Sequence, residues 1–150
     1  MLMIAHYSKI LLFLYLNLGG NGGEMNRASK RTRDNLVGVD SRLILLVGYT
    51  LAISEIDFFV NEGLRSEARQ KKLYGQGKSR CDGIIKKSKH QEGKAIDIYY
   101  VGWKNTDDED DKRWDKLIES FRKAGKMLGL KLDFGYDWGW DKPHIELKEG

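Results

Sequence analysis

The sequence predicts an α+β fold, in which helices pack on a small antiparallel sheet. Long apolar or amphipathic stretches suited to helices occur at residues 41–53 and 106–128. Short stretches in which apolar and polar residues alternate, as in half-buried strands, begin at Ala95 and at His144. The strands are therefore grouped late in the chain, an order that favours α+β over a regular succession of strand and helix.

Residues 1–24 need an explanation separate from the domain. An apolar run at residues 10–16 follows Lys9 and resembles a weak signal peptide, but it is too short to span a membrane and no small-x-small cleavage site follows it. Residues 22–25 can instead be encoded by a purine-rich ribosome-binding site ahead of a start codon. We favour this second interpretation, with Met25 as the true start and export by the apolar run as the alternative.

The rest of the chain divides at about residue 36. Residues 25–35 are polar and basic, and we expect a flexible lead-in there. Residues 36–150 form the predicted domain. Asp40 or Ser41 is expected to cap an apolar helix that continues to Ile53 and belongs to the core.

A second helix is expected to open at the capping box Thr106–Glu109 and to end at Gly129. Its core-facing residues share one helical face: Trp114, Leu117, Ile118, Phe121 and Leu128. Residues 130–134 lead back to a dense aromatic group, which either packs on the core or lines a cleft: Phe134, Tyr136, Trp138 and Trp140.

Before the first motif, a strand-like run at Ile56–Val60 leads to Arg65 and Ser66, and Ser66 can cap the helix that begins at Glu67. The guanidinium of Arg65 is then expected at the mouth of a strand-to-helix loop, where it can bind a carboxylate or a developing oxyanion with two hydrogen bonds. The alternative is an ordinary surface salt bridge. Leu73 and Tyr74 are expected to pack rather than to act chemically.

The first of two unusual motifs runs from Ser88 to Asp97 and contains His90. Alternation in the strand turns Asp97 toward a groove, and Gly93 lets the backbone bring the imidazole and the carboxylate together. The residues expected on the buried side of this strand are aliphatic: Ile96, Ile98 and Val101.

In the second motif, Trp140–Glu146, apolar and polar residues again alternate after Pro143. This alternation places His144 on a second, adjacent strand. Two imidazoles and a carboxylate, from His90, Asp97 and His144, are a ligand set that zinc uses, and three protein ligands leave a fourth position for water. Such a water still needs a base. Asp141 is the first candidate and Glu146 the second.

These two motifs, Ser-x-His-x-x-Gly-x-Ala-x-Asp and Asp-x-Pro-His-x-Glu, resemble those of the zinc D-alanyl-D-alanine peptidase superfamily of murein hydrolases. The similarity is greatest to its branch of phage-type endolysins that act as L-alanyl-D-glutamate peptidases, and it extends upstream over residues 56–77. The resemblance implies a hedgehog-like fold with zinc in a cleft on the sheet. It further implies the following roles: His90, Asp97 and His144 as ligands, Asp141 as base, Arg65 at the substrate, and Ser88, Gly93, Trp140 and Glu146 in support.

Composition is compatible with this assignment. The chain has 150 residues, 41% of them hydrophobic, which suffices for one domain with a single core. Its net charge of +4 suits attraction to an anionic wall polymer as well as to nucleic acid. Because the lysines look scattered and no helix presents a basic face, a nucleic-acid partner is disfavoured. Cys81 is the only cysteine and is expected to be an incidental free thiol.

The sequence thus predicts a monomeric zinc peptidase that hydrolyses an amide in peptidoglycan stem peptides, most directly the L-alanyl-D-glutamate bond. The alternatives are a D-alanyl-D-alanine carboxypeptidase or dipeptidase, and a non-catalytic zinc-containing domain that binds the cell wall. No stable membrane insertion is expected. Without a signal, the protein would stay in the host cytoplasm until lysis and would need a holin-type partner to reach the wall.

Overall fold

The computed structural model describes residues 26–105 and 112–149. Its elements, in chain order, are α2 (Lys30–Asn35), α3 (Ser41–Ile53), β1 (Phe58–Glu62), α4 (Glu67–Gly75), β2 (Ala95–Tyr100), α5 (Lys112–Met127), β3 (Leu132–Phe134), α6 (Gly135–Trp138) and β4 (His144–Leu147). Residues 1–24 and the predicted capping box at 106–109 lie outside the described residues. Among the described helices, none is long and apolar enough to cross a membrane.

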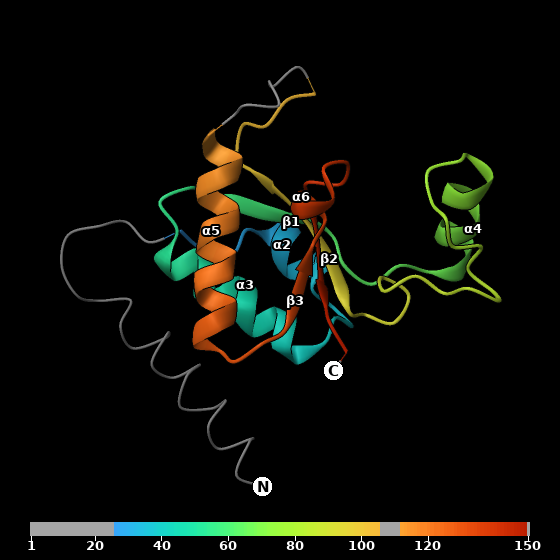
Figure 1. Cartoon of the computed structure of the whole chain (residues 1–150), viewed down its shortest axis with the longest axis horizontal. Coiled ribbons are helices and arrows are strands. Elements are labelled where there is room, and N and C mark those ends of the chain that lie inside the picture. Colours follow the sequence, from blue (N-terminus) through green and yellow to red (C-terminus); the bar gives the residue numbers. More distant parts are fainter. Residues whose placement is uncertain (1–25, 106–111, 150) are drawn as a thin grey trace, which may run out of the picture.

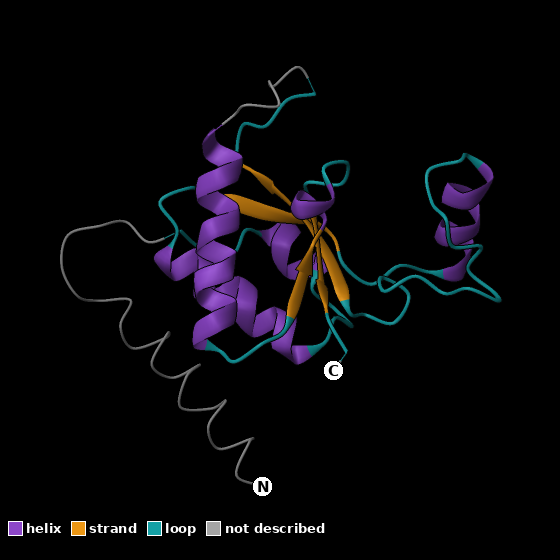
Figure 2. Cartoon of the chain, in the orientation of Figure 1, coloured by secondary structure: helices purple, strands orange, loops and turns teal. Residues whose placement is uncertain are grey.

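The four strands form one sheet in the order β1-β2-β4-β3, and every neighbouring pair is antiparallel. Helices α3 and α5 pack together on one face of this sheet, whereas α4 and the loop that follows it project away from the body (Figures 1 and 2). The α+β class predicted from the sequence is confirmed.

The core lies between the sheet and the two long helices. The predicted apolar face of α5 is buried at Trp114, Leu117, Ile118 and Phe121, with Leu128 partly buried. Asp40, rather than Ser41, caps α3, since its carboxylate accepts the backbone N–H of Arg42 at 2.9 Å.

Strand β2 corrects one detail of the expected alternation. Ile96, Ile98 and Tyr100 are all fully buried, whereas Val101 is 55% exposed in the turn after the strand. Side chains on a strand alternate between its two faces, so Tyr100 and not Val101 follows Ile96 and Ile98 on the buried face. The prediction for Val101 was wrong. Strand β1 likewise begins at Phe58 rather than at Ile56, and it extends two residues beyond Val60.

The segment expected to be a flexible lead-in contains helix α2. Ser29 caps this helix by accepting the N–H of Thr32, and the Thr32 hydroxyl, itself fully buried, accepts the N–H of Val60 at 3.1 Å. Asn35 donates to the carbonyl of Val60 at 2.9 Å. These side chains satisfy backbone groups of the edge strand β1, and this tertiary pairing orders a polar segment whose composition alone predicts flexibility.

Candidate metal centre

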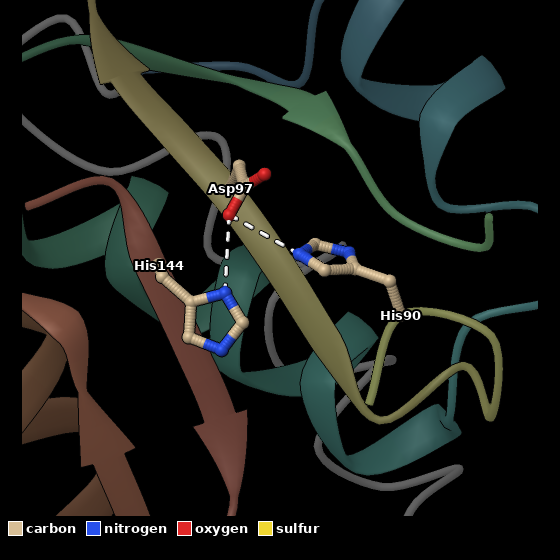
Figure 3. A group of neighbouring side chains, drawn as sticks. All are labelled: His90, Asp97 and His144. Carbon is tan, nitrogen blue, oxygen red and sulfur yellow. Dashed lines mark hydrogen bonds and ion pairs between the residues drawn. The ribbon is translucent and has the colours of Figure 1, made fainter. Parts of the chain in front are cut away.

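The three predicted ligands converge on one point. In the part of the chain that the structure describes, His90, Asp97 and His144 form a group whose potential ligand atoms all lie within 4.8 Å of one another. Asp97 Oδ1 is 3.2 Å from His90 Nε2 and 3.3 Å from His144 Nδ1. Dashed lines in Figure 3 mark these two contacts. This agrees with the convergence predicted for residues that are 47 positions apart in the chain.

The sheet and one turn produce this convergence. Asp97 on β2 and His144 on β4 are directly opposed in the strand register. Their side chains lie on the face away from the core, because Ile96 and Ile145 beside them are fully buried. His90 lies in the turn before β2, where Gly93 has a φ of +68° and a Cβ added to it would lie 2.7 Å from the carbonyl oxygen of Gly38. Gly93 is therefore required for this close approach.

Hydrogen bonds on the outer side of each imidazole fix which nitrogen faces the centre. His90 Nδ1 lies 2.8 Å from the carbonyl oxygen of Gly63, which can only accept, so Nδ1 donates to it and Nε2 faces the centre. His144 Nε2 lies 2.8 Å from Glu146 Oε2, which leaves His144 Nδ1 facing Asp97. Metal-ligating histidines are oriented in this way by carbonyls and carboxylates.

Charges in the cluster are strongly coupled. Burial opposes the charged form of Asp97, yet its hydrogen bonds to His144 and His90 hold the pKa of this carboxyl well below its usual range. Burial also opposes protonation of His144, but its bonds to Asp97 and Glu146 outweigh burial and raise the pKa of the imidazole to about 9. Two imidazole nitrogens and one anionic oxygen, facing inward with their outer atoms occupied, are a donor set that fits a divalent metal such as zinc.

Asp141 is held next to the ligands by a tight turn. Its carbonyl accepts the N–H of His144 at 3.1 Å, and a Cβ added to Gly135 would lie 2.1 Å from that carbonyl oxygen, so only glycine allows α6 to approach so closely. Burial, and next the negative charge of Asp97, raise the pKa of the Asp141 carboxyl.

Four carboxylates line the cleft at the centre: Glu62, Asp97, Asp141 and Glu146. Asp97 faces both imidazoles, Glu146 bonds His144, and Glu62 bonds Arg65. Among the described residues, no side chain makes a hydrogen bond or ion pair with the carboxylate of Asp141. It is therefore the carboxylate that is free to exchange a proton with a bound molecule.

Only 9% of the Arg65 side chain is exposed, so it does not form an ordinary surface salt bridge. It makes two bonds to Glu62, at 3.0 and 2.5 Å, donates to Gln70 Oε1 at 2.9 Å, and lies 3.8 Å from Asp97 Oδ2. Burial favours a higher pKa for Glu62, but the hydrogen bonds and charge of Arg65 outweigh burial and lower this pKa. This network places the guanidinium at the wall of the cleft, beside Asp97.

Sequence reasoning missed Glu62, the Gly63 carbonyl, Gln70 and Gly135. Glu62 lies opposite Asp97 because β1 has a bulge between Val60 and Glu62. Without the extra residue, Glu62 would share the core-facing side of Val60, and no sequence signal marks the bulge. Gln70 is fully buried on α4, a position where an isolated polar residue would not be expected.

Three of the four predicted supporting residues, Ser88, Trp140 and Glu146, line the same cleft, which has a volume of about 710 Å³. Ser88 shapes the turn that carries His90, since its N–H donates to Gln91 Oε1 at 3.0 Å. Trp138 and Trp140 line the cleft and stack with ring centroids 5.4 Å apart.

The remaining aromatic predictions divide between core and surface. Phe134 is buried in the core and Tyr136 packs against it. Leu73 lines the cleft, but Tyr74 is 52% exposed, so the expectation that Tyr74 packs was wrong.

Two histidines and an aspartate in one cleft, with a free carboxylate beside them, are the side-chain set that metallopeptidase centres use. Comparison with known proteins identifies the branch. The chain matches the family described as phage L-alanyl-D-glutamate peptidase over residues 25–148, and it belongs to that family of peptidoglycan peptidases. The recognition made from the two motifs is confirmed.

Two relatives support this membership. The L-alanyl-D-glutamate peptidase of Escherichia phage T5 is 32% identical over 123 residues, which cover 81% of this chain and 88% of the relative. The crystal structure of the Serratia marcescens L-Ala D-Glu endopeptidase ChiX is similar with a TM-score of 0.70 and 28% identity, over 83% of this chain and 92% of that one.

Proposed function

We propose that this protein is a zinc-dependent endolysin that hydrolyses the L-alanyl-D-glutamate amide of peptidoglycan stem peptides. The observation that carries the proposal is the convergence of His90, Asp97 and His144 in a cleft that also holds the free carboxylate of Asp141. Both relatives are named for this bond, which favours it over the D-alanyl-D-alanine bond.

The metal would be held by His90 Nε2, Asp97 and His144 Nδ1. When bound, it supplies Lewis-acid activation of water and of the scissile carbonyl. Gly63 and Glu146 hold the two imidazoles in the orientations that present these nitrogens. The rings therefore need not turn when the metal enters, and the proton that the raised pKa of His144 retains would be displaced.

Asp141 is proposed as the general base. Its carboxylate takes a proton from the attacking water and returns it to the nitrogen of the leaving D-glutamate, so that the amide breaks into a carboxylate and an amine. The raised pKa of Asp141 suits this exchange, because a carboxylate that binds a proton more strongly is a better base. Arg65, fixed by Glu62 and Gln70, is proposed to stabilise the carbonyl oxygen or a carboxylate of the substrate.

A non-catalytic wall-binding domain is the alternative of another class, and the free Asp141 beside the ligands favours catalysis over it. We further propose that the enzyme is a monomer that stays in the host cytoplasm until lysis and reaches the wall with the help of a holin. Export by residues 1–24 remains the alternative route, and those residues lie outside the described part of the chain.

The test is hydrolysis of purified murein by the zinc-loaded protein, with released fragments identified by mass spectrometry. New L-alanine carboxyl termini and D-glutamate amino termini are expected, and a chelator should abolish them until zinc is restored. Release of D-alanine alone would assign the enzyme to the carboxypeptidases. A protein that binds murein but releases no fragments would support the wall-binding alternative.

A further inference from the structure

One loop beside the cleft carries a dense positive charge. Residues 76–89, here called the basic loop, follow α4 and end just before His90. They hold five basic side chains and one acidic one, so their formal charge of +4 equals that of the whole chain. The expectation of scattered lysines is therefore wrong for this region. The basic residues are Lys78, Arg80, Lys86, Lys87 and Lys89.

All five of these residues line the cleft that contains the metal centre. The acidic residue of the loop does not, because Asp82 Oδ1 accepts the backbone N–H groups of residues 84–86 at 2.7 to 3.1 Å. The four acidic side chains of the cleft all come from β1, β2, β4 and the turn before β4. The cleft thus has one wall that is cationic and another that carries the ligands and Asp141.

Most of the cationic wall makes no ion pair within the described residues. Within residues 26–105 and 112–149, Lys78, Lys86 and Lys87 make no ion pair, and each is exposed. The guanidinium of Arg80 lies 5.4 Å from the ring centroid of Trp140, on the opposite side of the cleft. Only Lys89 is paired, with Glu92 and Glu149. Asp82 and Glu67 are near enough to Lys86 and Lys87 to interact with their charges but form no ion pair with them. A bound carboxylate would therefore meet these lysines without breaking an ion pair of the described residues.

The basic loop is also held in place. The fully buried Gln70 donates to Ser79 Oγ at 2.8 Å and to the carbonyl of Cys81 at 2.7 Å, while its own oxygen accepts from Arg65. Gln91, next to the ligand His90, donates to the carbonyl of Gly83 at 2.9 Å. These bonds tie the loop backbone to the arginine and to the histidine turn, so the segment that carries the lysines is held beside the metal centre, which lowers the entropic cost of binding.

We propose that the basic loop is a carboxylate-binding wall, which selects substrates that carry free carboxylates close to the cleaved amide. This inference rests on the proposed function, since a D-glutamyl unit in amide linkage to L-alanine carries a carboxyl group that is not part of the cleaved bond. Lys78, Lys86 and Lys87 are the specificity-determining residues. They contact the substrate through its charge and take no part in proton transfer.

The test uses two synthetic stem peptides that differ only in having free carboxylates or the corresponding carboxamides. The zinc-loaded protein should cleave the carboxylate form with a kcat/KM about tenfold higher, since each partly exposed ion pair contributes a factor of roughly two to five. The preference should decrease as the salt concentration rises. The triple variant Lys78→Gln, Lys86→Gln, Lys87→Gln should reduce the ratio of the two kcat/KM values to about one.

A matched control is the triple variant Lys123→Gln, Lys126→Gln, Lys131→Gln, which removes the same charge from exposed positions that do not line the cleft. It should keep the preference. Both kcat/KM values are measured on the same protein sample, so a variant with a smaller folded fraction loses activity on both peptides equally and the ratio does not change. Equal cleavage of both peptides by the unchanged protein, or an equal loss of preference in both variants, would refute the proposal that the basic loop binds substrate carboxylates. Cleavage of neither peptide would instead refute the proposed function.

Discussion

Replacement of Asp141 by asparagine tests most directly whether this centre is catalytic. The substitution keeps the size and the polarity of the side chain but removes its ability to accept a proton. The other cleft carboxylates already have partners. Asp97 is bonded to His90 and His144, Glu62 to Arg65, and Glu146 to His144, so none of them is free to replace Asp141. We therefore expect a loss of at least about 100-fold in kcat, or about 2.7 kcal/mol in the activation barrier.

The assay should measure hydrolysis and metal content on the same sample. Since Asp141 is not one of the three converging ligands, Asp141→Asn should retain one zinc per chain, whereas His144→Ala should lose both zinc and activity. Asp137→Asn is a suitable control, because Asp137 is exposed, pairs with Arg122 at 2.6 Å and does not line the cleft. An Asp141→Asn enzyme that binds zinc and cleaves murein at nearly the normal rate would refute the assignment of the base.

Three further predictions concern the supports of the site and the limits of the domain. Glu146→Ala should weaken zinc binding about 10- to 100-fold in a competition titration, and Glu146→Gln less, because an amide oxygen can still accept from His144 Nε2. Asp40→Ala should lower the free energy of unfolding by about 1 kcal/mol, and Asp40→Asn by less, in denaturant titrations. The pKa of Asp40 is lowered chiefly by its hydrogen bond to Arg42. The stabilisation from this carboxylate should therefore be fully present above the unfolded-state pKa of 3.8 and should be lost as the pH falls through the lower folded-state pKa. Equal stability of wild type and Asp40→Ala at neutral pH would contradict the cap. Deletion of residues 1–24 should leave the melting temperature and zinc-dependent activity unchanged, since the match to the family begins at residue 25; a drop of several degrees would show that the segment packs on the domain.

Much of the site was predictable because its signals are local. The spacing of His90, Gly93 and Asp97 places a turn before a strand, and alternation along that strand separates Asp97 from the buried Ile96 and Ile98. The same alternation puts His144 and Glu146 on one face of β4. Helix caps at Asp40 and Ser66 were likewise readable, because a cap depends on residues within one turn of it.

What the sequence by itself determined about this protein is therefore the class of fold, the family and which three residues converge in the cleft, all carried by short motifs with a fixed period. Tertiary structure decided the remaining features, because those features depend on contacts between segments that are distant in the sequence. The bulge in β1 turned Glu62 from the core face to the metal face, and the buried Gln70 joined Arg65 to a loop whose charge faces the cleft. Helix α2 became ordered only because its side chains satisfy the edge of β1, a contact across 28 residues that no local pattern can specify.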